Sequence, residues 1–256
     1  MKNHSSQRDM QALARLAASD PDRLLCARFL PGPAQHGALV LIAFHNELIR
    51  ALAPARSAAV AGPMAGLVRL QWWREVLERT RPPEHTLAPL LVDMVARGQV
   101  RQQTLLRLVQ SCEVELTGPR DVATWHGMLR DGAGAMQRAV GELLGQEDAN
   151  ALHTLELCGM AYGAGAMLRH WPALQQSGRF VWPAEVDALR QQGRAWLEEL
   201  DWPHLPQTLR LAALPAVLAR RDLLRGTAQA DQPRGLGDRA AVLWQGLKAL
   251  RAFERA

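Results

Sequence analysis

Arginine supplies most of the side chains in this sequence that could bind an anionic ligand. Four of these arginines, Arg50, Arg69, Arg74 and Arg169, lie in segments that are predicted to be helices. A guanidinium group is planar and presents a fork of N–H donors, which suits it to phosphate oxygens. One hypothesis is therefore that the chain binds a diphosphate through arginine side chains, without a metal ion.

Carboxylates are the other groups that could do chemistry here. Metal binding or acid–base catalysis between helices needs acids that converge, typically from positions three or four apart. The sequence has two close acidic pairs, Glu75 with Glu78 and Glu198 with Asp201. Both fall on polar helix surface or at a helix end, so a solvated face is their better interpretation. Spacing alone predicts neither a carboxylate metal site nor a catalytic acid–base pair.

The eight histidines and three cysteines give no metal-binding pattern. No His-x-x-x-His, His-Glu-x-x-His or Cys-x-x-Cys spacing occurs. His45 and His170 stand out because they lie on two predicted helices that we expect to face each other. Cys26, Cys112 and Cys158 are odd in number and widely spaced, which supports no disulfide framework and predicts a reducing compartment.

The elements that must position these side chains are predicted to be helices. Ala, Leu, Arg and Gln dominate the chain, whereas β-branched residues are sparse and aromatic residues make up 5%. Proline and glycine mark the breaks between helices. The predicted helices span residues 22–29, 34–53, 64–80, 87–97, 102–116, 124–144, 149–171, 185–200, 206–225 and 239–254.

The segment from Leu155 to Pro183 is predicted to be the centre of the protein. Its stretch between Gly159 and Ala166 consists mostly of glycine and alanine, and each glycine inside a helix costs about 1 kcal/mol relative to alanine. Small residues allow another backbone or a ligand to come close. The segment is therefore either a tightly packed central helix or one wall of a cavity, and composition alone does not separate the two.

Length and charge limit the remaining possibilities. The chain has 256 residues, 48% of them hydrophobic, and a formal net charge of +5, which suits phosphate groups or an anionic membrane surface but equally reflects a GC-rich genome. No signal-peptide core and no run of roughly 18 uncharged apolar residues is present. Basic residues do not interleave with exposed aromatic residues, so no nucleic-acid partner is predicted. We predict a cytoplasmic protein and leave open peripheral contact with the inner face of an anionic membrane.

Five segments, in order, resemble the squalene/phytoene synthase family, the head-to-head isoprenyl diphosphate synthases. They are Asp22–Pro31, Leu39–Ala53, Arg69–Glu78, Gly127–Gly145, and the run from Cys158 to Val186 that includes Gly178-Arg179. The similarity covers about residues 20–190. It implies one all-α domain over residues 1–256, an isoprenoid-synthase-type helical bundle around a central cavity. Residues 1–19 are expected to be a flexible N-terminal segment, and residues 226–238 a flexible joint before the C-terminal helix.

The resemblance also implies how the family's metal ions are held, and this chain departs from that pattern. In the family, two aspartate motifs on facing helices hold Mg²⁺ and the substrate diphosphates. The first motif, Ala-Phe-Cys-Arg-x-x-Asp-Asp-x-x-Asp, falls on residues 43–53, where Ile49, Arg50 and Ala53 take the places of its acids. The second motif keeps its arginine, but its polar and acidic positions fall on Gly163, Ala166, His170, Ala173 and Leu174.

Because hard cations need carboxylate oxygens, these departures imply that Mg²⁺ does not bind at the family site and that no other cofactor is needed. The chain is then not expected to catalyse the family's condensation. It is similar to the degenerate branch that includes the mitochondrial complex I assembly factor with a squalene/phytoene-synthase domain. The predicted role is that of a pseudoenzyme that binds a partner protein or an apolar, isoprenoid-like ligand.

Two alternatives stay open beside this hypothesis. The first is an isoprenyl diphosphate-binding transferase with a remodelled, metal-independent site. The second is a membrane-peripheral factor whose basic helices matter more than any cavity. No catalytic residue and no metal ligand is predicted. The candidate ligand-binding residues are Phe44, His45, Asn46, Arg50, Arg69, Trp73, Arg74, Gly163, Ala166, Arg169, His170 and Arg179.

Overall fold

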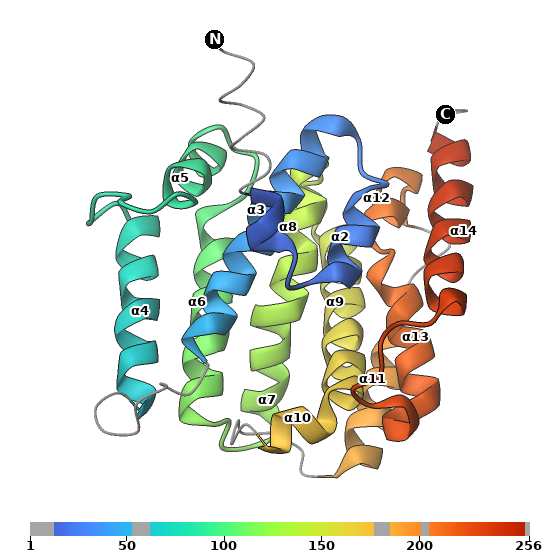
Figure 1. Ribbon diagram of the computed structural model, residues 1–256. Helices are drawn as coiled ribbons and strands as arrows, with labels where there is room; N and C mark the ends of the chain where they lie inside the picture. Colours follow the sequence, from blue (N-terminus) through green and yellow to red (C-terminus); the bar gives the residue numbers. More distant parts are fainter. Residues whose placement is uncertain (1–12, 53–61, 177–184, 201–204, 254–256) are drawn as a thin grey trace.

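A computed structural model describes residues 13–52, 62–176, 185–200 and 205–253. Every regular element within these ranges is a helix (Figure 1), which confirms the predicted all-α fold. The elements are α2 (Pro21–Ala27), α3 (Gly32–Ala51), α4 (Gly62–Leu77), α5 (Ala88–Ala96), α6 (Gln102–Thr117), α7 (Val122–Leu129), the π-helical turn η1 (Arg130–Gly134), α8 (Ala135–Leu143), α9 (Ala149–Arg169), α10 (Trp171–Gln176), α11 (Val186–Glu198), α12 (Gln207–Ala212), α13 (Pro215–Arg225), the 3-10 turn η2 (Gly226–Gln229) and α14 (Leu236–Phe253).

Helix α9 is the centre of the bundle. It contacts α8 and η1 on one side and α11 and α13 on another. Beyond α8 lies α6, with α4 packed against it at one edge of the molecule, whereas α14 packs on α12 and α13 at the opposite edge (Figure 1). The prediction that the run from Leu155 forms the centre is therefore correct for the part that the structure describes.

The small residues of α9 serve both purposes that the sequence left open. On one face, a Cβ atom at Gly165 would lie 3.4 Å from the Cα atom of Ala219, so the glycine allows α13 to approach closely. On another face, Gly163 and Ala166 line a cavity. Close packing and cavity wall thus coexist on different sides of the same helix.

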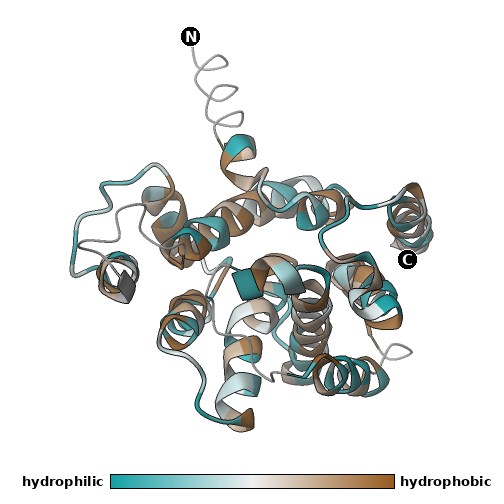
Figure 2. Ribbon diagram, turned by 60° about the horizontal axis from the view of Figure 1, so that its bottom comes forward, coloured by the Kyte–Doolittle hydropathy of each residue, from teal (hydrophilic) through white to brown (hydrophobic). Residues whose placement is uncertain are grey.

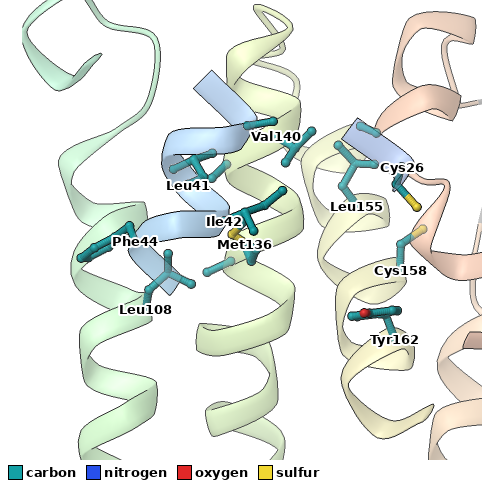
Figure 3. Packing of buried hydrophobic residues seen from close by; sticks show 14 of the residues in the cluster. Cys26, Leu41, Ile42, Phe44, Leu108, Met136, Val140, Leu155, Cys158 and Tyr162 are labelled. Atoms are coloured by element: carbon teal, nitrogen blue, oxygen red, sulfur yellow. The ribbon is translucent and has the colours of Figure 1, made fainter. Parts of the chain in front are cut away.

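The core fills the space between α3, α6, α8 and α9, where side chains from each helix interdigitate (Figure 3). Leu41 and Phe44 of α3 and Leu108 of α6 are among the side chains almost fully removed from solvent. The three cysteines are buried and form no disulfide. Burial raises the pKa of Cys158 to about 12, so this thiol stays protonated at neutral pH.

Proline positions account for several helix starts, although two predicted boundaries were wrong. Pro33 lies in the first turn of α3, so the break between α2 and α3 covers residues 28–31 and not residues 30–33, as the Pro-Gly-Pro sequence suggested. Pro172 does not close the central helix. Helix α9 ends at Arg169, and Pro172 lies in the first turn of the short helix α10.

Two segments predicted as single helices are interrupted. Residues 124–144 were predicted as one helix but contain α7, the turn η1 and α8. Residues 206–225 were predicted as another but divide into α12 and α13, with Pro215 at the start of α13. A proline has no N–H to donate, so the hydrogen bonding of α12 cannot continue through Pro215.

The two segments expected to be flexible contain ordered, buried residues. Residues 13–17 of the N-terminal segment are helical, and Leu13 and Ala17 are buried in the core. Residues 226–238 include η2 and the side chain of Arg234, which is only 7% exposed because three carboxylates surround it. None of the described helices is both long enough and apolar enough to cross a membrane.

Candidate functional site

A cavity of about 650 Å³ opens in the middle of the bundle. Its walls come from α3, α6, α7, η1, α9 and α10, together with residues 19–23 and 231–234. It therefore has walls from both α3 and α9, which correspond to the predicted helices 34–53 and 149–171 that we expected to face each other. A volume of this size is typical of a small-molecule site, roughly 300–1,000 Å³.

Apolar side chains form much of the cavity wall. They come from five helices that are distant in sequence, so only the folded bundle brings them together. They are Ile49 of α3, Leu108 of α6, Met128 and Leu129 of α7, Met167 of α9 and Leu174 of α10. Such walls favour a ligand with a substantial apolar body, because each buried methylene contributes about 0.8 kcal/mol.

Arg23 provides a cation beside these walls. Its Cζ atom lies 4.8 Å from the centre of the Tyr162 ring, and its Nη1 atom donates to Oδ2 of Asp20 at 2.7 Å. Burial opposes ionisation of Arg23, but favourable interactions, of which that with the Asp20 carboxylate is the largest, together outweigh burial and raise the pKa of the arginine. Burial also raises the pKa of Tyr162 well above its usual value, so its phenol is neutral. Among the described residues, Nε of Arg23 has no hydrogen-bond partner.

Arg169 holds the residues that cover one end of the cavity. Its Nη2 atom donates to the carbonyl oxygen of Gln232, and its own carbonyl accepts a hydrogen bond of 2.7 Å from the backbone N–H of Asp231. A longer contact of 3.9 Å joins Nη1 to Asp222 of α13. The end of α9 is thereby tied to the segment that leads into α14.

Arg234 extends this charge network across the fold. Its Nη2 atom lies 2.7 Å from Oδ2 of Asp22, and its Nη1 atom lies 2.5 Å from Oδ1 of Asp222 and 3.6 Å from Oδ2 of Asp238. The two buried carboxylates next to Arg234 differ in the direction of their pKa shifts. Burial raises the pKa of Asp222, whereas for Asp238 hydrogen bonds from Arg225 and Arg221 overcome the effect of burial and hold the pKa well below its usual value.

The π-helical turn η1 lies in the cavity wall through Gly132 and Ala133. A π-turn inserts an extra residue into a helix and leaves part of the backbone without its usual partners. Here Ser111 donates to the carbonyl oxygen of Met128 at 2.8 Å. Arg107 braces the turn further by pairing with Asp131 at 2.8 Å. The wall is thus held in its irregular shape by contacts from α6.

Six predicted ligand-binding residues line the cavity: His45, Asn46, Gly163, Ala166, Arg169 and His170. Some of them have partners within the chain. Nδ2 of Asn46 donates to the carbonyl oxygen of Leu16 at 3.0 Å. Nδ1 of His170 lies 3.6 Å from Oδ1 of Asp231, which would form an ion pair when the imidazole is protonated. The structure therefore brings these six residues together at one cavity.

The other predicted residues lie elsewhere. Phe44 and Trp73 are core residues whose rings pack edge to face at a centroid distance of 5.1 Å. Arg50 is exposed and pairs with Glu47 on its own helix. Three arginines complete the set: Arg69 is exposed, Arg74 pairs with Glu113 at 2.7 Å, and Arg179 lies outside the described residues.

Sequence reasoning missed the other polar residues of the cavity. Asp20 and Asp22 were interpreted only as a helix start, although Asp20 does cap α2 by accepting a hydrogen bond of 2.9 Å from the backbone N–H of Arg23. Arg234 was missed because its segment reads as a flexible joint. The available signal was an arginine in a Gly- and Pro-containing segment, which does not by itself distinguish a solvated loop from a buried ion pair.

The carboxylates at the cavity are engaged with cations rather than grouped around an empty centre. Asp20 is paired with Arg23, and Asp22 with Arg234. In the part of the chain that the structure describes, no three His, Cys, Asp or Glu side chains form a cluster that could hold a metal ion. Ile49, His170 and Leu174, the residues that the resemblance aligns with acidic positions of the family motifs, all line the cavity.

Comparisons with known proteins agree with this architecture. A family model described as "Squalene/phytoene synthase" matches residues 16–195. A crystal structure of a dehydrosqualene synthase in complex with ligand matches with a TM-score of 0.73 at 13% sequence identity, over 96% of this chain and 99% of that chain. Squalene synthase HpnC from Alicyclobacillus acidocaldarius matches with a TM-score of 0.56 at 15% identity, over 96% of this chain and 93% of that chain. A search of curated protein sequences gives no significant match.

Proposed function

The chain belongs to the squalene/phytoene synthase family, and on that basis we propose that it is a non-catalytic member that binds an apolar, isoprenoid-like ligand. The observation that carries this proposal is the cavity of about 650 Å³, whose walls include apolar side chains from five helices. A collapsed remnant of a site would have closed this space with side chains. The open volume supports the proposal that a ligand occupies the cavity.

The charges at the cavity support a binding role that does not need Mg²⁺. Arg23, Arg169 and Arg234 each face a carboxylate of the same chain. A Mg²⁺ ion needs several free oxygen ligands in a near-octahedral arrangement, whereas Asp20 and Asp22 are already held by arginines. The residues present therefore do not fit the family's metal cluster, and a ligand with a weakly charged or neutral head suits the site best.

The alternative of metal-independent diphosphate binding has less support. It relied on Arg50, Arg69, Arg74 and Arg169, of which only Arg169 lines the cavity. That arginine already donates to the carbonyl oxygen of Gln232 and lies 3.9 Å from Asp222. A diphosphate would have to displace these partners. A separate protein partner remains the other form that a non-catalytic role could take.

If the protein is non-catalytic, it should not turn over isoprenyl diphosphates. Purified protein incubated with farnesyl or geranylgeranyl diphosphate and Mg²⁺ is expected to release no pyrophosphate above a protein-free control, because the metal ligands are lacking. Radiolabelled substrate and a pyrophosphate assay would measure this. Formation of a condensed C30 or C40 product that EDTA abolishes would refute the non-catalytic assignment.

The binding part predicts that filling the cavity removes ligand affinity. Ala166 is half-buried in the cavity wall, so Ala166→Phe places a ring where the ligand's apolar body would lie. We expect farnesol to bind the wild-type chain in isothermal titration with the same affinity with or without EDTA. The variant should bind at least about tenfold more weakly, a loss of about 1.4 kcal/mol.

A matched control separates cavity filling from a general effect of an added ring. Ala173 of α10 lies seven residues further along and is exposed, so Ala173→Phe should leave the affinity for farnesol unchanged. If both variants bind farnesol like the wild-type chain, the cavity is not the ligand site. A titration in which farnesyl diphosphate binds tightly in EDTA, and farnesol does not bind, would favour the metal-independent diphosphate site instead.

A further inference from the structure

The solvent-facing side of α14 is apolar, which is unusual for the outermost helix of a bundle. Leu236, Leu243, Trp244 and Leu247 are 85%, 46%, 69% and 48% exposed. Their spacing of three or four residues, together with Ala240, places them along one stripe of the helix. The opposite side of α14, which includes Val242 and Ala249, is buried against the bundle. The helix therefore has two apolar faces, and the described residues cover only one of them.

Position in the fold makes this stripe accessible to a large surface. Helix α14 packs on α12 and α13 and forms the edge of the molecule opposite to α4 (Figure 1). Figure 2 shows α14 nearly end-on at the outer border of the bundle. A flat surface could therefore contact the stripe along the length of the helix.

Positive charge is concentrated in the C-terminal part of the chain that includes α14. Residues 205–253 contain eight Arg or Lys residues and three Asp residues, so they carry the whole excess of positive charge of the chain, +5. Two of the three acids, Asp222 and Asp238, are buried and paired with arginines. The exposed charges of α14 within the described residues are all positive: Arg239, Lys248 and Arg251.

These cations flank the apolar stripe. At 3.6 residues per turn, Arg239 lies to one side of it and Lys248 to the other, with Arg251 near its C-terminal end. Next to Lys248, Arg210 and Arg220 line a groove of about 590 Å³ between α12, α13 and α14. An apolar face that carries Trp and Leu with basic residues on its borders is typical of a helix lying in the interface of an anionic bilayer.

We propose that α14 docks on an anionic lipid surface, with its Leu236–Trp244–Leu247 stripe buried at the headgroup boundary and its arginines and lysine on lipid phosphates. Charge complementarity selects this occupant over a second copy of the chain, because two copies would bring their basic borders together. The proposal does not depend on ligand binding in the cavity. It would place a protein that binds an apolar ligand against the phase in which such ligands dissolve.

Vesicle sedimentation with the full chain tests this surface. We expect binding to vesicles that contain phosphatidylglycerol and little binding to pure phosphatidylcholine, with loss of binding as salt rises from about 0.1 M to about 1 M. Replacing Arg239, Lys248 and Arg251 together by Gln should weaken binding by about fivefold for each residue removed. Trp244→Gln combined with Leu247→Gln should weaken vesicle binding by more than about tenfold, because it removes two large apolar side chains from the stripe.

The matched control is Met64→Gln combined with Val68→Gln, on α4 at the other edge, where the two side chains are 67% and 64% exposed. This variant also replaces two exposed apolar side chains of one helix by Gln, and it should bind vesicles like the wild-type chain. Circular dichroism should show unchanged melting for all variants, since the altered residues are exposed. Equal vesicle binding by the α14 and α4 variants, or binding that ignores salt and lipid charge, would overturn the proposal. So would light scattering that shows a wild-type dimer which the α14 variant dissociates, without vesicle binding.

Discussion

Replacing Arg234 by alanine is expected to lower the free energy of unfolding by about 3–5 kcal/mol. The guanidinium group contacts Asp22, Asp222 and Asp238 at 2.7, 2.5 and 3.6 Å. The side chains of Asp222 and Asp238 are 3% and 2% exposed. Removing the cation leaves buried carboxylates without full compensation, which is far more costly than losing an exposed ion pair. Urea or thermal denaturation followed by circular dichroism would measure the difference.

The pH dependence of this loss gives the prediction a second readout. Burial already raises the folded-state pKa of Asp222 above its usual value, and removal of Arg234 would raise it further. A folded pKa above the unfolded value means that the folded state binds more protons, so stability increases as pH falls through that interval. The stability deficit of Arg234→Ala should therefore be smaller at pH 5 than at pH 7.

The control for Arg234 is another arginine five residues away. Arg239 is exposed on α14, and Arg239→Ala should change the free energy of unfolding by no more than about 0.5 kcal/mol. Arg234→Lys keeps the charge but cannot donate to two carboxylates from a fixed fork, so its loss should be intermediate. A wild-type melting curve for Arg234→Ala would contradict the prediction, because it would mean that the ion pairs of Arg234 do not stabilise the fold.

The fold could be predicted from the sequence because its signals are local. Helix-forming composition, proline breaks and apolar periodicity locate α3, α6 and α9 to within a few residues. The turn η1 was missed because a π-turn arises from packing against a neighbour, here through Arg107 and Ser111 of α6. The break before α13 could have been seen at Pro215, but the helical pattern on both sides concealed it.

The position of the cavity could be predicted from the sequence, but only some of the polar side chains around it could. A family resemblance located two facing helices, and six residues on them do line the cavity. The sequence did not show which arginines lie at the cavity and which lie elsewhere. Outside the cavity, Arg50 pairs with Glu47 on its own helix and Arg74 with Glu113 of α6. At the cavity, Arg234 reaches Asp22 across 212 residues of chain. Long side chains find partners in three dimensions, and helical periodicity carries no information about such distant pairs.

The second prediction with a large expected effect concerns Gly159, where α9 lies very close to the backbone of η1. A Cβ atom at this position would lie 2.1 Å from the carbonyl oxygen of Ala133 and 2.8 Å from the Cα atom of Gly134. Both atoms belong to the backbone of η1, which cannot move aside as a flexible side chain would. We therefore expect Gly159→Ala to destabilise the fold by about 3 kcal/mol or more, at the upper end of overpacking effects. This outcome runs against the gain of about 1 kcal/mol that alanine normally brings inside a helix.

Gly127 of α7 is the matched control, because it is also helical but a methyl group added to it would meet no heavy atom of another element within 4 Å. Gly127→Ala should leave the protein as stable as wild type or more stable, by about 0.5–1 kcal/mol. The two variants make the same chemical change, so opposite signs would isolate the contact between α9 and η1. Since η1 contributes Gly132 and Ala133 to the cavity wall, Gly159→Ala should also weaken farnesol binding in protein that remains folded. If Gly159→Ala instead melts like Gly127→Ala, the backbone contact between α9 and η1 does not limit the size of the residue at position 159, and the prediction is wrong.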